Sequence, residues 1–214
     1  MKLNQTKLRR FYLGVVSLYG VCFDYDAIAL LKHYFPDFDG ECLMIDLKNR
    51  SIKLTKDYSI WEYKTDNENE NGYMIVDPFY DDSDAARIEE IQSSKHIFIP
   101  QTFEMLCEYG DKPYLKIHFL ARERIQNALK DILPKKTPKY QVEIMFEIIL
   151  DLIVSGVNFA EILKHIERMI GGQFRSQEHL QKMADAIVYA LNNTKIPENR
   201  GYSPAEFVAT NGHN

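Results

Sequence analysis

The side chains best suited to chemistry in this sequence are six histidines and three cysteines. The histidines are spread along the whole chain, at His33, His96, His118, His165, His179 and His213. None stands four residues from another or at ligand spacing from a cysteine. The cysteines, Cys22, Cys42 and Cys107, are too few and too scattered for a disulfide framework or a zinc site. The sequence therefore predicts no metal site built from histidine and cysteine.

A group of aspartates is the other candidate for metal binding, at Asp77, Asp81, Asp82 and Asp84. Their spacing lacks the central glycine and the final glutamate of an EF-hand loop. Carboxylates just before a helix also favour the positive end of its dipole. We expect them to solvate a loop and start a helix, so the predicted metal site is none, with cation binding as the alternative.

Motifs for catalysis and for cofactors are missing from the sequence. It contains no G-x-S-x-G, no G-x-x-x-x-G-K-[ST] and no G-x-G-x-x-G. We therefore predict no catalytic residue and no cofactor, and we favour a non-enzymatic protein over an enzyme of unrecognised type.

The elements that would position a site form two predicted modules. Residues 1–80 contain three expected helices. The first ends at Gly20, the second runs from Asp24 to Tyr34, and the third covers 41–49. Asp24 is expected to cap the second helix. Strands are expected over 51–56, 58–63 and 72–77. The apolar face of the first helix contains Leu8, Phe11, Tyr12, Val15, Val16 and Tyr19. Three helices followed by a hairpin are typical of a winged-helix module.

The second predicted module, residues 81–214, is a helical bundle. Helices are expected over 83–93, 102–109, 113–132, 138–155, 158–170 and 177–192, with a short strand over 96–100, a stop at Gly110 and a last helix from Ser203. Short connections favour antiparallel neighbours. The predicted fold class is therefore α+β and mostly helical, with a winged-helix-like N-terminal module followed by a C-terminal helical bundle.

No segment is predicted to cross a membrane. In the most apolar window, 142–157, Glu143, Glu147 and Asp151 are spaced four residues apart and form one polar stripe on a helix. The first 22 residues suit an amphipathic helix better than a signal peptide. With free cysteines and no export signal, we expect a cytoplasmic protein.

Charge is distributed unevenly along the chain. The 214 residues carry a net charge of −5, which disfavours a globally basic nucleic-acid binder. Residues 36–111 hold 18 acidic and seven basic side chains, a net charge of −11, whereas the segments on either side are each +3. An acidic block over 62–90 is therefore expected to engage a protein, for example one with a basic surface.

A nucleic-acid interface is the alternative for the first module. In that alternative, basic side chains of the first and third helices and the hairpin would contact phosphates: Arg9, Arg10, Lys48, Arg50, Lys53 and Lys56. The loop 65–70 opposes this hypothesis because it places three acids where a wing would meet the backbone. A second basic cluster at Lys130, Lys135, Lys136 and Lys139 is a solvated linker or a contact for RNA or an acidic partner.

The most distinctive segment of the sequence follows the helix over 177–192. We expect a structural clasp, in which Arg200 and Glu206 can pair and a capping box opens the last helix. Its residues are Asn192, Asn193, Pro197, Arg200, Gly201, Ser203, Pro204 and Glu206.

The clasp also carries a family resemblance. Asn192-Asn-Thr followed by Asn199-Arg-Gly-Tyr-Ser-Pro-Ala-Glu206 resembles a segment of uncharacterised proteins from Gram-positive bacteria and their mobile elements. Leu18-Tyr-Gly20 and Ile97-Phe-Ile-Pro100 are similar to two further stretches of that group. Many members carry a SEC-C zinc motif directly after this segment, and no such motif follows here. The resemblance implies a winged-helix-like front and a helical back, without zinc binding and without an established activity.

These observations predict an interaction or regulatory protein. We expect it to bind a protein partner through its acidic block or its apolar faces. The alternatives are a DNA- or RNA-binding regulator and an enzyme of unrecognised type.

Overall fold

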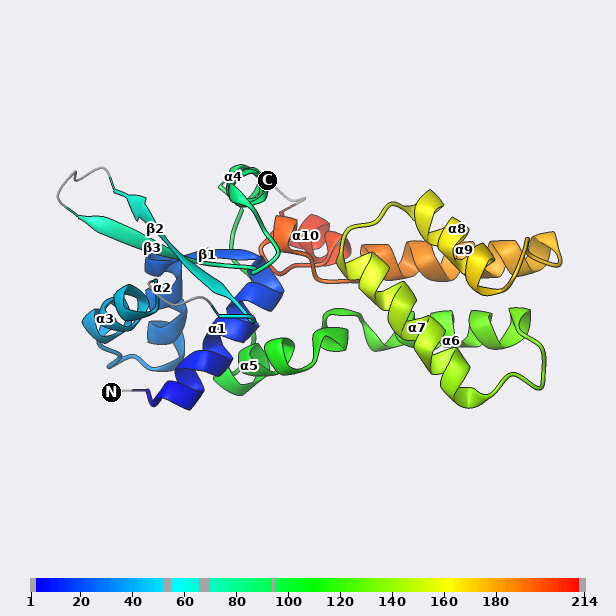
Figure 1. Ribbon diagram of the computed structural model, residues 1–214, viewed down its shortest axis with the longest axis horizontal. Helices are drawn as coiled ribbons and strands as arrows, with labels where there is room; N and C mark the ends of the chain where they lie inside the picture. Colours follow the sequence, from blue (N-terminus) through cyan, green and yellow to red (C-terminus); the bar gives the residue numbers. More distant parts are fainter. Residues whose placement is uncertain (1–2, 52–54, 66–69, 94, 212–214) are drawn as a thin grey trace. The chain divides into compact units, whose positions relative to one another are not determined.

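The protein is α+β and mostly helical (Figure 1), as predicted. The computed structural model describes residues 3–51, 55–65, 70–93 and 95–211. Its contacts divide the chain into two units, Met1–Pro113 with Pro197–Gly201, and Tyr114–Ile196 with Tyr202–Asn214. We predicted a boundary after residue 80, whereas this division assigns residues 81–113 to the first unit.

The first unit begins with α1 (Gln5–Tyr19), which is capped by Asn4 because its side chain accepts a hydrogen bond from the Lys7 amide at 2.9 Å. The helix ends at Gly20, whose positive φ of 68° lets the chain turn there. Both this end and the predicted apolar face are confirmed, because all six of its side chains are buried.

A three-stranded antiparallel sheet follows, built from β1 (Val21–Phe23), β2 (Ser59–Lys64) and β3 (Asn71–Val76) in the order β1-β3-β2. The sequence did not predict β1, because three residues are too few to show a period. The strand expected over 51–56 is wrong at both of its described ends. Ser51 closes a helix, residues 55 and 56 lie outside any strand, and residues 52–54 lie outside the described ranges.

Two helices lie between β1 and β2 in the chain, α2 (Asp24–Tyr34) and α3 (Gly40–Ser51). The cap position of α2 is Phe23 rather than Asp24. The Asp24 carboxylate accepts from the Tyr25 amide at 2.7 Å, as a cap would, and also from the Tyr73 amide at 2.8 Å. It therefore fastens the start of α2 to β3.

Two further helices complete the first unit, α4 (Asp82–Gln92) and α5 (Phe103–Asp111). The predicted stop at Gly110 is wrong. Gly110 lies inside α5. Neither Gly110 nor Gly14 of α1 has a side chain, so the backbones of α1 and α5 can touch at these two positions. A Cβ atom on Gly14 would lie 2.1 Å from the Leu106 carbonyl oxygen. The predicted strand over 96–100 is also absent from that described stretch.

The second unit is helical. The 3-10 turn η1 (Pro113–Lys116) spans its start at Tyr114, and its helices are α6 (Phe119–Ile132), α7 (Lys139–Val154), α8 (Phe159–Met169), α9 (Gln177–Asn192) and α10 (Pro204–Asn211). The 3-10 turn η2 (Pro197–Asn199) belongs to the first unit. Side chains of α6, α7, α8 and α9 form one apolar core. The predicted boundaries of α9 are confirmed. Among the described helices, none is long and apolar enough to cross a membrane.

Candidate functional site

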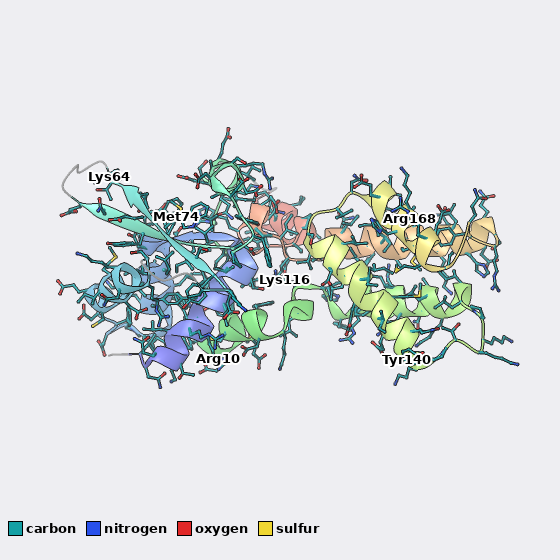
Figure 2. All side chains as sticks on the ribbon, in the orientation of Figure 1. Arg10, Lys64, Met74, Lys116, Tyr140 and Arg168 are labelled. Atoms are coloured by element: carbon teal, nitrogen blue, oxygen red, sulfur yellow. The ribbon has the colours of Figure 1, made fainter. Side chains whose placement is uncertain are left out.

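A groove of about 530 Å³ opens on the sheet of the first unit. Trp61 of β2 and Met74 of β3 are cross-strand partners, and both are partly exposed in the groove. Figure 2 labels Met74 on its strand. Ala85 and Ala86 of α4 line the facing wall, where their small side chains leave room. The floor is therefore an indole and a thioether, two large polarisable surfaces.

Two carboxylates lie beside this apolar floor, those of Asp82 and Glu89 on α4. Glu62 of β2 also lines the groove, but alternation along the strand places its side chain on the opposite face of the sheet from Trp61, with that of its cross-strand partner Tyr73. All three are exposed. Asn71 donates a hydrogen bond to Glu62. Within the described ranges, none of the three forms an ion pair with a lysine or arginine. The groove therefore carries negative charge that the fold does not neutralise, beside an apolar surface.

The helix α4 is held over the sheet from both ends. At its start, Asp81 and Asp84 form a reciprocal capping box, with Asp81 accepting from the Asp84 amide at 3.0 Å. In its middle, Ala85 and Ile88 pack on Val21 and Val76 of the sheet, while at its end Gln92 donates to the Tyr19 carbonyl at 2.7 Å. The aspartates at this corner thus start a helix, as expected.

An aromatic cluster continues the groove beyond Glu89. A second hollow of about 150 Å³ shares Glu89 and is lined also by Phe23 and Tyr25. The rings of Phe23 and Tyr25 stack at 5.3 Å, and Tyr63 meets Phe23 edge-on at 5.3 Å. Burial, followed by the nearby Asp24 charge, raises the pKa of Tyr63, so this hydroxyl is protonated at neutral pH. This second hollow therefore combines an aromatic surface with the ion pair of Asp26 and Arg200, which also lines it.

The predicted nucleic-acid contacts do not form one free basic face. Arg9 pairs with Asp57 at 2.6 Å, and Arg10 pairs with Asp111 at 2.7 Å. The side-chain hydrogen bond that Arg9 donates to Asp57, followed by the charge of Asp57, raises the pKa of Arg9. These two guanidinium groups therefore already have an acidic partner within the first unit.

The third arginine of the predicted set, Arg50, lies in a partly buried network. It donates to Asp46 at 2.6 Å and to the Tyr58 hydroxyl at 2.8 Å, and the Tyr12 hydroxyl donates to Asp46 at 2.7 Å. Burial would raise the pKa of Asp46, but hydrogen bonds from Gln5, Tyr12 and Arg50 outweigh it and lower that pKa. The network ties α1 to α3.

The lysines of the predicted set have a different environment. Lys48 and Lys56 are exposed and have no ion pair within the described part of the chain, whereas Lys53 lies outside it. The acidic loop 65–70 also lies largely outside, with only its end residues described. Two exposed lysines are thus the described remainder of the predicted basic set.

The predicted clasp is divided between the two units. Pro197, Arg200 and Gly201 belong to the first unit, where Arg200 pairs with Asp26 and donates to the Lys95 carbonyl at 3.1 Å. Gly201 has a φ of 85° and lies against the Tyr19 ring. The five-residue segment Pro197–Gly201 therefore holds α2 and the end of α4 together.

The remaining clasp residues belong to the second unit. Asn192 ends α9, Asn193 is its C-cap, and Pro204 begins α10. The predicted capping box is confirmed, because Glu206 accepts from the Ser203 amide at 2.8 Å. The expected pair between Arg200 and Glu206 is wrong.

Other ions satisfy the two charges that we expected to pair. Glu206 binds Lys195 at 2.8 Å, and Arg200 binds Asp26. Burial of the Lys195 ammonium lowers its pKa, although Glu206 opposes this. The clasp therefore contains two separate ion pairs, one in each unit, instead of one ion pair between Arg200 and Glu206.

No group of three or more histidine, cysteine or acidic side chains in the described ranges could hold a metal ion. Cys22 and Cys107 are buried, and burial raises the pKa of the Cys107 thiol to about 11. A thiol with that pKa is a poor nucleophile at neutral pH.

Comparisons with protein-family models, with curated proteins and with solved structures find no match to this chain. The resemblance of the Asn192–Glu206 segment to the Gram-positive proteins therefore stays a prediction.

Proposed function

We propose that this chain is a non-enzymatic interaction or regulatory protein that binds a basic segment of a partner protein in the groove between α4 and the sheet. The observation that carries the proposal is the combination of Trp61 and Met74 with two carboxylates, Asp82 and Glu89, that lack an ion pair among the described residues. An aromatic face attracts a lysine or arginine head group, and the aliphatic stems of these side chains pack on apolar surface. Apart from Trp61, the residues that line the groove lie in the acidic block 62–90.

Charge complementarity favours a cationic partner over an anionic one. A phosphate backbone entering this groove would meet Asp82 and Glu89, and like charges facing one another across an interface are costly. A basic segment meets the same carboxylates as attractive partners. Its binding would therefore weaken as salt is added.

The test is a titration of a dye-labelled ten-lysine peptide, read by fluorescence anisotropy. We expect binding to the intact chain and at least roughly tenfold weaker binding to a triple variant, Glu62→Gln, Asp82→Asn and Glu89→Gln. A control with the same change in net charge carries Glu123→Gln, Glu161→Gln and Glu178→Gln in the second unit, and it should bind as the intact chain does. Equal binding by the two triple variants would contradict the groove as the site.

A nucleic-acid-binding regulator is the second candidate. The order α1-β1-α2-α3-β2-β3, with β1 paired to β3, supports a winged-helix-like module, in which α3 would enter a major groove. The exposed Lys48 and Lys56 are the described contacts for it. A gel-shift series against salt tests this candidate, and the absence of a shift at low ionic strength would exclude it.

A further inference from the structure

The helix α7 of the second unit exposes an apolar stripe that its own core does not use. Tyr140, Ile144 and Ile148 are spaced four residues apart, so they lie along one side of the helix. Their exposed fractions are 62%, 50% and 40%. The opposite side of the same helix buries Phe146, Ile149 and Ile153 in the core. Figure 2 labels Tyr140 near the N-terminal end of this helix.

The charges that flank the stripe are separated along the helix. Three exposed lysines lie at or before its first turn, Lys135, Lys136 and Lys139. Exposed acids lie toward its other end, at Glu147 and Asp151. None of these five side chains forms an ion pair with any residue that the structure describes. The stripe therefore has a positive end and a negative end.

This polarity is the reverse of what stabilises an isolated helix. The helix dipole favours acids at the N-terminus and bases at the C-terminus, and α7 has neither an acid in its first turn nor a base in its last. An antiparallel neighbour with the same sequence changes the balance. It brings the lysines of one helix to the acids and the negative dipole end of the other.

We infer that α7 pairs with α7 of a second copy of this chain, antiparallel and about a two-fold axis near Ile144. Such an interface is self-complementary: Tyr140 meets the partner's Ile148, and Lys139 meets the partner's Glu147 at both ends. This pairing is independent of the groove in the first unit.

The size of the stripe sets the strength of the dimer. A 16-residue helix is about 24 Å long and roughly 10 Å wide. The area that one side of it can bury is therefore smaller than the about 800 Å² that each partner buries in a stable complex. The dimer is therefore reversible, and its population depends on protein concentration and on salt.

The experiment is sedimentation velocity of the full chain over a wide range of concentrations. The mass should rise toward that of a dimer with concentration, and Ile144→Glu should abolish the rise because two glutamates would meet at the axis. Val188→Glu, at a side chain 46% exposed on α9, is the matched control and should dimerise normally. Circular dichroism of each variant checks that it is folded.

Charge reversal tests the antiparallel arrangement itself. Lys139→Glu and Glu147→Lys should each raise the dimer dissociation constant at least tenfold, because like charges then meet at both ends. An equimolar mixture of the two variants should dimerise again, since each end then joins a lysine to a glutamate. A wild-type chain that stays monomeric at every concentration would overturn the inference, as would a mixture no more associated than its components.

Discussion

Two charged regions of the first unit differ in what the fold does with their charges. On α1 and α3, the arginines Arg9, Arg10 and Arg50 each pair with an aspartate. In the groove, Asp82 and Glu89 have no ion pair with a lysine or arginine among the described residues. The segment charges of the sequence do not reveal this difference, because pairing joins residues that are far apart in the chain. Which charges remain available, rather than how many there are, decides the partner.

Among the substitutions that test this comparison, a change at Gly14 should have the largest effect on the free energy of unfolding. Gly14→Ala would force the α1 and α5 backbones apart, because the new Cβ atom would lie 2.1 Å from the Leu106 carbonyl oxygen. This would also separate Arg10 from Asp111. We expect the free energy of unfolding to fall by about 3 kcal/mol, measured by urea denaturation.

A matched helical substitution controls for the alanine itself. Asn127 is exposed on α6, and Asn127→Ala should leave the unfolding free energy unchanged or slightly raised. Equal stability of Gly14→Ala and the wild type would mean that α1 and α5 do not touch as described.

The next effect concerns the buried part of the basic region. Asp46→Ala would leave the Tyr12 hydroxyl and the Arg50 guanidinium without their shared acceptor. We expect a loss of about 2–3 kcal/mol in the free energy of unfolding at pH 7. Chemical denaturation measures it.

The same residue predicts a pH dependence. Hydrogen bonds lower the pKa of Asp46 in the folded chain, so its contribution to stability is full above the unfolded pKa and is lost as pH falls through the folded pKa. The stability difference between the wild type and Asp46→Asn should therefore shrink as pH falls below about 4. A constant difference from pH 6 to pH 2.5 would contradict the assigned role.

A smaller effect separates the shape of the groove from its charge. Trp61→Ala keeps the carboxylates of Asp82 and Glu89 and removes the indole beside them. We expect roughly tenfold weaker binding of a ten-lysine peptide, measured by anisotropy, because stacking and burial of the lysine stems are lost. Unchanged affinity would reduce the site to a nonspecific acidic surface.

The smallest effect should come from the exposed part of the basic region. Arg9 pairs with Asp57, but 60% of its side chain is exposed, and such pairs contribute little to stability. Arg9→Gln should leave the thermal midpoint unchanged in a calorimetric scan. A clear drop in that midpoint would show that exposed and buried arginine pairs here are equivalent.

Local sequence signals predict much of this fold, but they fail where the structure depends on a contact between residues that are distant in the sequence. The limits of α9 and the capping box at Ser203 follow from residues within one turn of the chain. The sequence predicts that a helix ends at Gly110, whereas Gly110 lies inside α5, where it allows a backbone contact with α1. No local signal in the chain reveals such a contact.

The groove could be predicted only in part. The acidic block 62–90 contains the acidic residues that line it, and the sequence predicts that this block engages a protein. No local pattern indicates that Trp61 and Glu89, 28 positions apart, line one hollow. That depends on strand register and on the packing of α4.

The most direct measurement uses Trp61, which is the single tryptophan of the chain. The intrinsic fluorescence of the intact protein is followed while an unlabelled ten-lysine peptide is added, and again with a ten-glutamate peptide. We expect a saturable change in intensity or wavelength with the lysine peptide, weaker at high salt, and none with the glutamate peptide. Binding of the lysine peptide by calorimetry without any change at Trp61, or no binding at all, would contradict this expectation.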